Sequence, residues 1–211
     1  MGQYYNPCVL RKNWKTAKNP VCASLKCYDY GNGAKLMEHS YIGNSFVRSM
    51  EFLLATVYNG LPFVWCGDYA DKVSTKTGEH DIYSDAGRFI YKDDDNRDGR
   101  SKAYEALRGT IPAMPEWKEG QVWNPYETIP YYKYLVNYSK KQYCIIPANK
   151  KGWQVHPLPL LTCSGNGRGG GDYCLDDNRV GSWAFDRIGV TNDRALFKGF
   201  KQISGIFKMD C

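Results

Sequence analysis

A glycine-rich segment near the C-terminal end of the chain has the composition of an anion-binding loop. It reads Gly-Asn-Gly-Arg-Gly-Gly-Gly-Asp from Gly165 to Asp172. Successive free N–H groups in such a loop can form a concavity that binds an anion, and the guanidinium of Arg168 is a planar fork that suits phosphate. A flexible surface turn is the alternative. The residues expected to bind a phosphate-bearing ligand are Asn166, Gly167, Arg168, Gly169, Gly170, Gly171 and Asp172.

A second segment has the spacing of a calcium-binding loop. From Asp94 onward it satisfies the pattern D-x-N-x-D-G followed by five residues and Glu. The side chains of Asp94, Asn96 and Asp98 would supply oxygen ligands, and the carbonyl of Arg100 and the carboxylate of Glu105 would complete the shell. The sequence therefore predicts a structural Ca²⁺ site. A serine stands where such loops usually carry an apolar residue, so a solvated acidic turn followed by a helix is the alternative.

Asn44 and Ser45 form a candidate for a second anion site. They precede an apolar segment with helical spacing, and free N–H groups and the positive end of the helix dipole meet at such a start. Ordinary helix capping by the same two residues is the competing interpretation.

Four further residues are candidates for acid–base catalysis, namely Glu38, His39, Asp68 and Asp71. An imidazole beside carboxylates can act as a general base, and two Asp residues near a turn can hold a hard cation. If the four converge, metal-assisted phosphodiester hydrolysis is the chemistry that they could perform. A purely structural histidine is the alternative. The sequence has no nucleophile elbow, Walker loop, dinucleotide fingerprint or HExxH motif.

The composition is that of a globular domain with many aromatic residues. Of the 211 residues, 43% are hydrophobic, 24% charged and 15% aromatic. Tyr and Trp combine apolar area with a polar group, so we expect some of them to line a binding surface. The net charge of +6 favours acidic partners such as nucleotides. Nucleic acid is a less favoured partner, because the sequence lacks a basic stripe, and a homo-oligomer stays open.

The cysteines and the start of the chain indicate a cytoplasmic protein. None of the eight cysteines forms a C-x-x-C pair, and with only three histidines a structural zinc site is disfavoured. The first residues have neither a charged n-region nor an apolar h-region, and no run approaches the length of a membrane span. We therefore expect reduced thiols, no membrane partner and a bacterial host cytoplasm if a phage encodes the chain. Disulfides are the alternative if a signal peptide once preceded it.

The hydrophobic pattern predicts a mixed, strand-rich α+β fold. Phe46, Val47, Met50, Leu53 and Leu54 share one helical face, which gives the best-defined helix. A second helix is expected over residues 101–108. The segments expected to be strands are 4–10, 22–30, 34–38, 61–66, 88–91, 131–146 and 183–191.

Proline and tryptophan divide the chain into an expected N-terminal α+β half and a C-terminal β-rich half. Residues 111–130 contain four prolines and two tryptophans and form the expected connection. It separates residues 1–110 from residues 131–211, which include the glycine-rich loop. An alternative arrangement has two related halves packed together. Two internal alignments of the chain suggest it, but they use different offsets and each matches only a few residues.

Several motifs resemble those of a family of small, uncharacterised bacterial and bacteriophage proteins. Members open with Met-Gly-Gln-Tyr-Tyr and contain a K-L-[ML]-E segment, a GNGRGGGD loop, a VG-x-W-A-x-D-R-I segment and a GDYAD segment. Here these are residues 1–5, 35–38, 165–172, 180–188 and 67–71. In the family GDYAD follows the glycine loop, whereas here it precedes the loop, so a rearranged or duplicated architecture is an option. The resemblance implies kinship and a phage association, without an activity.

The sequence leaves three functional hypotheses. The first is a non-catalytic binding protein for a phosphate-bearing small ligand, a nucleotide or cyclic oligonucleotide, which in a phage could sequester a host signalling nucleotide. The second is a metal-assisted phosphodiesterase or nuclease that uses the acid–base candidates or Asp172. The third is a protein–protein inhibitor or a structural phage protein.

Overall fold

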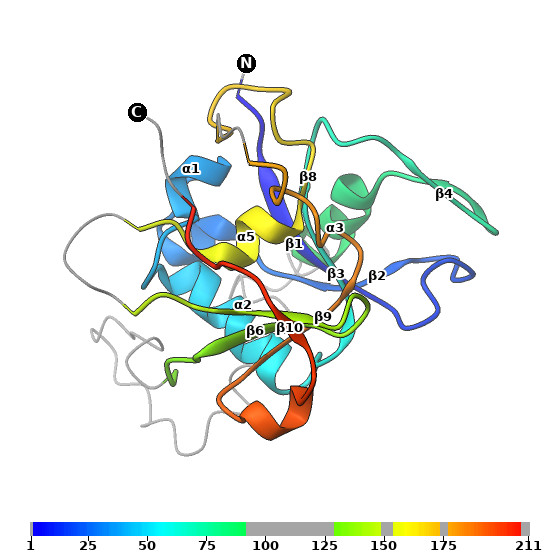
Figure 1. Cartoon of the computed structure of the whole chain (residues 1–211). Helices are drawn as coiled ribbons and strands as arrows, with labels where there is room; N and C mark the ends of the chain where they lie inside the picture. Colours follow the sequence, from blue (N-terminus) through cyan, green and yellow to red (C-terminus); the bar gives the residue numbers. More distant parts are fainter. Residues whose placement is uncertain (1, 92–128, 149–153, 174–176, 208–211) are drawn as a thin grey trace, which may run out of the picture.

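One large mixed sheet organises the fold, with helices on both of its faces (Figure 1). The computed structural model describes residues 2–91, 129–148, 154–173 and 177–207. The strand order is β10-β7-β6-β9-β3-β1-β2, and β8 pairs with β3 beside this path. The strands are β1 (Tyr5–Leu10), β2 (Val21–Ser24), β3 (Leu61–Gly67), β6 (Tyr134–Asn137), β7 (Gln142–Ile145), β8 (Cys163–Ser164), β9 (Arg187–Thr191) and β10 (Lys201–Gln202).

The central strands β1 and β3 are buried on both faces. They pair antiparallel, with Cys8 opposite Val64 and Asn6 opposite Cys66. Side chains alternate between the faces of a strand, so Phe63 and Trp65 enter one core while Val64 and Cys66 enter another. This explains why β3 is apolar throughout instead of alternating between apolar and polar residues.

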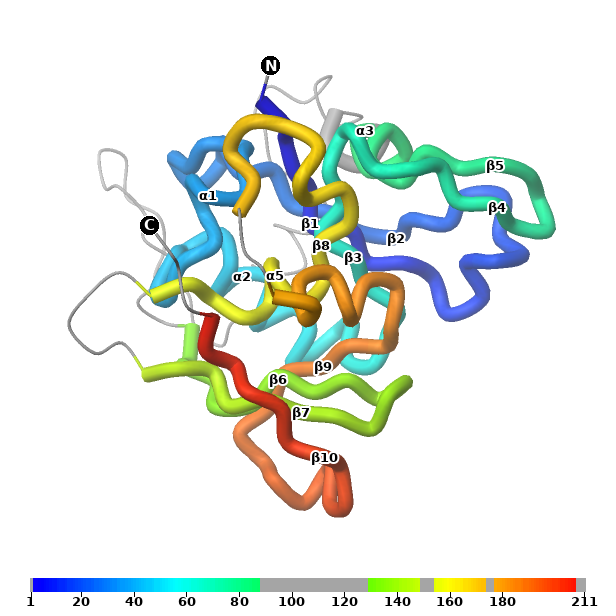
Figure 2. The backbone as a smooth tube through the Cα atoms, turned by 45° about the horizontal axis from the view of Figure 1, so that its top comes forward, coloured from blue at the N-terminus to red at the C-terminus, as the bar shows by residue number. Residues whose placement is uncertain are grey.

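The larger core lies between the sheet and three helices. These are α1 (Leu36–His39), α2 (Ser45–Ala55) and α5 (Pro157–Thr162). α2 packs against β9 and α5 packs against β3, and fully buried side chains from all three helices join this core. Figure 2 shows α2 and α5 crossing the same region of the sheet. The short 3-10 helix η1 (Cys27–Tyr30) adds to the same side.

The opposite face of β1 and β3 is covered by α3 (Ile82–Tyr91). Ile82 and Ala86 of this helix pack with Val64, Cys66 and the neighbouring β1 side chains. At the far end of the sheet, the 3-10 helix η3 (Arg194–Phe197) places Phe197 in a small cluster with Val136 and Tyr143. A separate hairpin consists of β4 (Val73–Thr75) and β5 (Gly78–His80).

The predicted α+β class is confirmed, and so are the strongest elements. The helix that follows Asn44 and the strands at residues 5–10 and 61–67 form as expected. Two expected strands are shorter than predicted, since β2 ends at Ser24 before η1 and β9 begins at Arg187, and two others are wrong. Residues 34–38 contain the start of α1, because the Glu38 side chain accepts from the backbone N–H of Lys35 and closes a helical turn. Residues 88–91 belong to α3, which begins after Asp81 caps the N–H of Ser84.

The sheet runs through both expected halves of the chain. β3, from the N-terminal half, pairs with β9 and β8 from the C-terminal half. Most of the expected connection, residues 111–128, lies outside the described residues, as does the helix expected over 101–108. The two related halves remain a prediction.

Candidate functional site

The glycine-rich turn encloses a carboxylate that belongs to the turn itself. The backbone N–H groups of Gly167, Arg168 and Gly169 all donate to Oδ2 of Asp172, at 2.9, 3.1 and 3.0 Å. Asp172 is only 5% exposed. The concavity expected from the sequence is therefore present, but its three amides already have an acceptor. The expectation that these amides are free for a ligand phosphate is wrong.

Two residues from the N-terminal segment of the chain complete the surroundings of this carboxylate. The Tyr5 hydroxyl donates to Oδ1 of Asp172 at 2.6 Å. Burial and the nearby Asp172 raise the pKa of Tyr5 well above its usual range, so the phenol stays a donor. The side-chain amide of Gln3 donates to Asp172 Oδ2 at 2.9 Å and to the Gly165 carbonyl at 2.7 Å.

Close packing against Gln3 explains why the turn needs glycine. A Cβ atom on Gly169 would lie 2.9 Å from the backbone nitrogen of Gln3, and one on Gly165 would lie 2.5 Å from the end of the Gln3 side chain. Gly165 also has φ of +104°, which L side chains rarely adopt. Packing and backbone conformation therefore account for these glycines without a ligand.

Arg168 has a partner as well. Its guanidinium binds both carboxylate oxygens of Asp71, at 2.7 and 2.8 Å, and Nη1 also donates to the Tyr69 carbonyl at 3.2 Å. The pair is exposed, and the Arg168 guanidinium lowers the pKa of Asp71. The arginine thus joins the glycine-rich turn to the GDYAD segment, two motifs that are far apart in the sequence.

The remaining acid–base candidates have structural contacts and do not converge on one another. Glu38 caps the first turn of α1, and Asp68 accepts from the N–H of Tyr4 at 3.0 Å. His39 is fully buried: Nδ1 lies 3.1 Å from the Gly33 carbonyl, and Nε2 is 2.9 Å from the indole nitrogen of Trp65. Burial lowers the pKa of His39 to about 4. These contacts support the structural alternative for His39.

Helix capping explains the residues of the predicted second anion site, whereas the predicted metal loop lies outside the described residues. Asn44 accepts from the N–H groups of Phe46 and Val47, at 2.9 and 3.3 Å, so the capping interpretation accounts for Asn44 and Ser45. The expected calcium ligands Asp94, Asn96, Asp98, Arg100 and Glu105 lie outside the described residues. Within the part of the chain that the structure describes, no group of three or more His, Cys, Asp or Glu residues could hold a metal ion.

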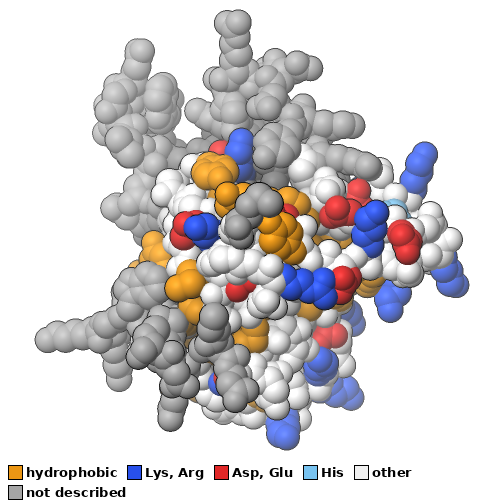
Figure 3. All heavy atoms as spheres, turned by 90° about the horizontal axis from the view of Figure 1, so that it is seen from above, with side chains coloured by type: hydrophobic (Ala, Val, Ile, Leu, Met, Phe, Trp, Pro, Cys, Tyr) orange, Lys and Arg blue, Asp and Glu red, His pale blue; other side chains and the backbone are white. Residues whose placement is uncertain are grey.

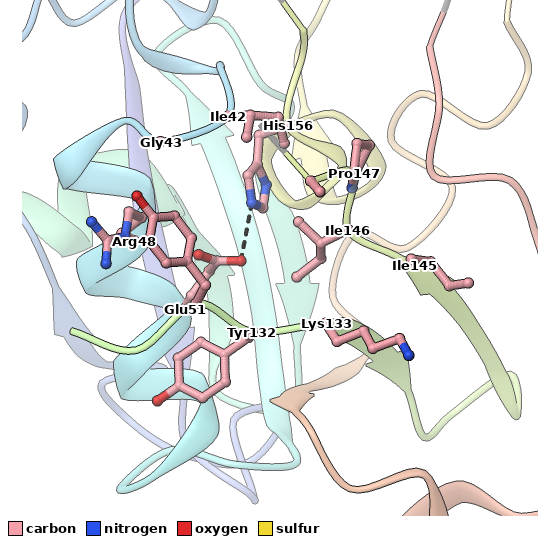
Figure 4. Close-up of a pocket in the computed structure, with 12 residues that line it drawn as sticks. Ile42, Gly43, Arg48, Glu51, Tyr132, Lys133, Ile145, Ile146, Pro147 and His156 are labelled. Carbon is pink, nitrogen blue, oxygen red and sulfur yellow. Dashed lines mark hydrogen bonds and ion pairs between the residues drawn. The ribbon is translucent and has the colours of Figure 1, made fainter. Parts of the chain in front are cut away.

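A pocket of about 510 Å³ lies elsewhere, between α2, β6, β7 and the start of α5 (Figure 4). Its size is within the range of small-molecule sites, roughly 300–1,000 Å³. Isoleucines and a proline form much of its wall, and charged and tyrosine side chains supply the polar groups. The lining residues are Ile42, Gly43, Arg48, Glu51, Tyr131, Tyr132, Lys133, Ile145, Ile146, Pro147, Ala148 and His156.

Arg48 is the unusual residue of this pocket. It is only 8% exposed, yet it forms no ion pair with any described carboxylate. One terminal nitrogen donates to the Ile129 carbonyl, the guanidinium carbon lies 4.1 Å from the ring centroid of Tyr131, and Nε has no hydrogen-bond partner. A buried cation without an anion is costly, so this guanidinium is suited to bind one.

Glu51 and His156 form a buried pair beside Arg48, 3.0 Å apart. Their side chains are 5% and 2% exposed. His156 Nδ1 accepts from the N–H of Leu158 at 3.1 Å, which places the proton of a neutral ring on Nε2. Nε2–H then donates to Glu51, so His156 orients the carboxylate and both of its ring nitrogens are in use. Figure 4 shows this contact beside the apolar wall of the pocket.

None of the residues that line this pocket was expected from the sequence to bind a ligand. Its one sequence signal is the pair of charged residues, Arg48 and Glu51, inside a helix whose residues 46–54 are all buried. His156, which lies 105 residues from Glu51, has no distinctive neighbours in the sequence.

Neither a family model, nor a curated protein, nor a solved structure matches the chain. In the described residues no helix is long and apolar enough to cross a membrane.

Proposed function

We propose that this chain is a non-catalytic binding protein for a phosphate-bearing small ligand, and that the ligand binds in the Arg48 pocket. The observation that carries the proposal is the buried Arg48 guanidinium, which has no carboxylate partner among the described residues and an unbonded Nε. A ligand phosphate beside the guanidinium would supply the missing negative charge. Lys133 lines the same pocket and adds a second cation.

The aromatic and acidic groups of the pocket support a nucleotide as the ligand. Tyr132 and the isoleucines offer apolar surface against which a base can stack. The Glu51 carboxylate, held by His156, accepts hydrogen bonds, so it is suited to the N–H groups on the edge of a base. One anion-binding side, one apolar wall and one acceptor correspond to the phosphate, ring and amino groups of a nucleotide.

Binding without turnover is supported by the contacts of the ionisable groups. Both ring nitrogens of His156 are already engaged, which leaves no free imidazole nitrogen to transfer a proton. Glu38, His39, Asp68 and Asp71 each have another contact, so a metal-assisted phosphodiesterase has less support. The resemblance to bacteriophage proteins extends the proposal to sequestration of a host signalling nucleotide.

Calorimetric titration with linear and cyclic nucleotides and with inorganic phosphate tests this proposal. We expect Arg48→Gln to weaken nucleotide binding by roughly 10-fold or more, because a hydrogen bond to a charged group is worth about 1.5–3 kcal/mol. Arg168→Gln is the matched control and should bind as the wild type does. A Tyr132→Ala variant should weaken nucleotides but leave inorganic phosphate unchanged.

Other outcomes would contradict the proposal that the ligand binds in the Arg48 pocket. Loss of binding in Arg168→Gln alone would place the ligand on the glycine-rich turn. Mg²⁺-dependent conversion of a nucleotide, detected by chromatography and lost in Asp68→Ala, would support the phosphodiesterase. If folded wild-type protein bound no member of the panel, the binding proposal would be wrong. That result would favour the third hypothesis, a protein–protein inhibitor or structural phage protein. Thermal unfolding of each variant verifies that it is folded.

A further inference from the structure

Two hairpins extend together from one side of the molecule (Figure 2). The first is the connection between β1 and β2, residues 11–20, and the second is the β4–β5 hairpin with Lys72 before it. They are hydrogen-bonded to each other: the N–H of Lys76 donates to the Lys15 carbonyl at 2.9 Å, and the Thr77 hydroxyl donates to the Ala17 carbonyl at 3.0 Å. We call residues 11–20 and 72–80 the basic arm.

The arm holds most of the chain's excess positive charge. All six of its Lys and Arg residues are exposed, and Glu79 is its one carboxylate. Figure 3 shows Lys and Arg side chains gathered on this side of the molecule. The neighbouring Asp71 is neutralised by Arg168. The basic residues of the arm are Arg11, Lys12, Lys15, Lys18, Lys72 and Lys76.

We propose that the basic arm binds the phosphate backbone of a double-stranded nucleic acid. Charges that are spread over two segments of the sequence become one basic surface because the hairpins lie side by side. Lysines on such a surface release condensed counterions when they contact phosphates, which gives affinity without reading the base sequence. This inference is independent of the Arg48 pocket.

The aromatic content of the arm favours a duplex over a single strand. Proteins that bind single strands commonly stack bases on exposed aromatic rings. Trp14, the one Phe, Tyr or Trp residue of the arm, is 7% exposed and stacks on Phe185, with ring centroids 5.6 Å apart. The Trp14 ring is therefore not available to a base, and the ring nitrogens of His80 contact Thr77 and Asp85. The arm also exposes no large apolar side chain that could enter a membrane surface.

The test measures binding of a fluorescent DNA duplex over a range of salt concentrations. Lys12→Gln/Lys18→Gln removes two exposed charges from the arm, and Lys198→Gln/Lys201→Gln removes two exposed charges near β10. We expect the slope of log K against log salt to become shallower by about 2 in the arm variant, since each phosphate contact contributes roughly 0.9. The slope should not change in the control variant.

Four results would overturn this inference. Equal effects of both double substitutions would mean that binding follows the net charge alone. Tighter, arm-dependent binding of the single strand of the same sequence would exclude the duplex as the preferred partner. Arm-dependent binding of phosphatidylserine vesicles without binding of DNA would identify a membrane surface. Absence of duplex binding by the folded wild type at low salt would remove the proposal altogether.

Discussion

Asp172 occupies the position that a ligand anion takes in a phosphate-binding loop. Three backbone amides, a phenol and a primary amide donate to its two oxygens. These donors come from the N-terminal segment, at Gln3 and Tyr5, and from the turn, so a single carboxylate connects the start of the chain to the glycine-rich turn. Hydrogen bonds to a charged acceptor are among the stronger ones in proteins.

Replacement of Asp172 should therefore destabilise the fold strongly. We expect Asp172→Ala to lower the free energy of unfolding by about 3 kcal/mol or more, because several buried donors lose their acceptor. Asp172→Asn keeps one acceptor oxygen and should have a smaller effect. Urea denaturation measures both. Asp71→Ala, which removes an exposed carboxylate, is the control and should leave the midpoint nearly unchanged.

His39 should make stability depend on pH. Its pKa is lowered from 6.5 to about 4 by burial, so the unfolded chain binds a proton at a higher pH than the folded chain does. Its contribution is complete above pH 6.5 and is lost progressively as the pH falls toward 4. The loss amounts to about 3 kcal/mol.

Denaturation of His39→Gln at a series of pH values isolates this contribution. Glutamine cannot be protonated and still offers a donor and an acceptor to Gly33 and Trp65. The difference in unfolding free energy between wild type and variant should change between pH 6.5 and 4, in favour of the variant at low pH. A difference that is constant with pH would contradict the assignment.

At the scale of elements, the helices and strands that the sequence predicted correctly are those stabilised by residues close to them in the chain. The α2 helix has its cap and its apolar face within one stretch of chain, and β3 is a continuous apolar run. Residues 34–38 and 88–91 are short apolar runs that fit either a strand or a helix. The hydrophobic pattern does not register the side-chain contacts that favour helix, which are Glu38 on the N–H of Lys35 and, before the second run, Asp81 on the N–H of Ser84.

The cap of α2 provides a test at this scale. We expect Asn44→Ala to lower the free energy of unfolding by about 1 kcal/mol, because the N–H groups of Phe46 and Val47 lose their acceptor. The exposed Asn13 is a matched asparagine, and Asn13→Ala should unfold at the wild-type urea concentration. Equal effects of the two substitutions would mean that the cap contributes nothing.

At the scale of the whole molecule, the candidate site could not be read from the sequence. The Arg48 pocket needs α2, the start of β6, the end of β7 and the residue before α5 in one place. Likewise, Tyr5, which donates to Asp172, and Asp71, which pairs with Arg168, lie 97 or more residues away from them in the sequence. The residue types predicted a concavity of backbone amides, but they did not show that Asp172 of the same turn fills it.

The shared sheet predicts how the molecule responds to a cut in its chain. A protease site engineered between residues 111 and 128 would separate β1–β3 from β6–β10 in covalent terms only. We expect the two pieces to co-elute in size-exclusion chromatography until urea is added, because β3 still pairs with β8 and β9. Elution of a folded N-terminal piece by itself would contradict this. The uncut variant with the same inserted site is the control.

The carboxylate of Asp172 also has a consequence for how the glycine-rich turn responds to its surroundings. Because this negative group is covalently attached to the backbone that surrounds it, dilution or dialysis cannot remove it. Changes in the sulfate or phosphate content of the cell therefore leave the conformation of the turn unaltered. Once the polypeptide has folded, the turn therefore keeps its hydrogen bonds to Gln3 and Tyr5 whatever anions surround it.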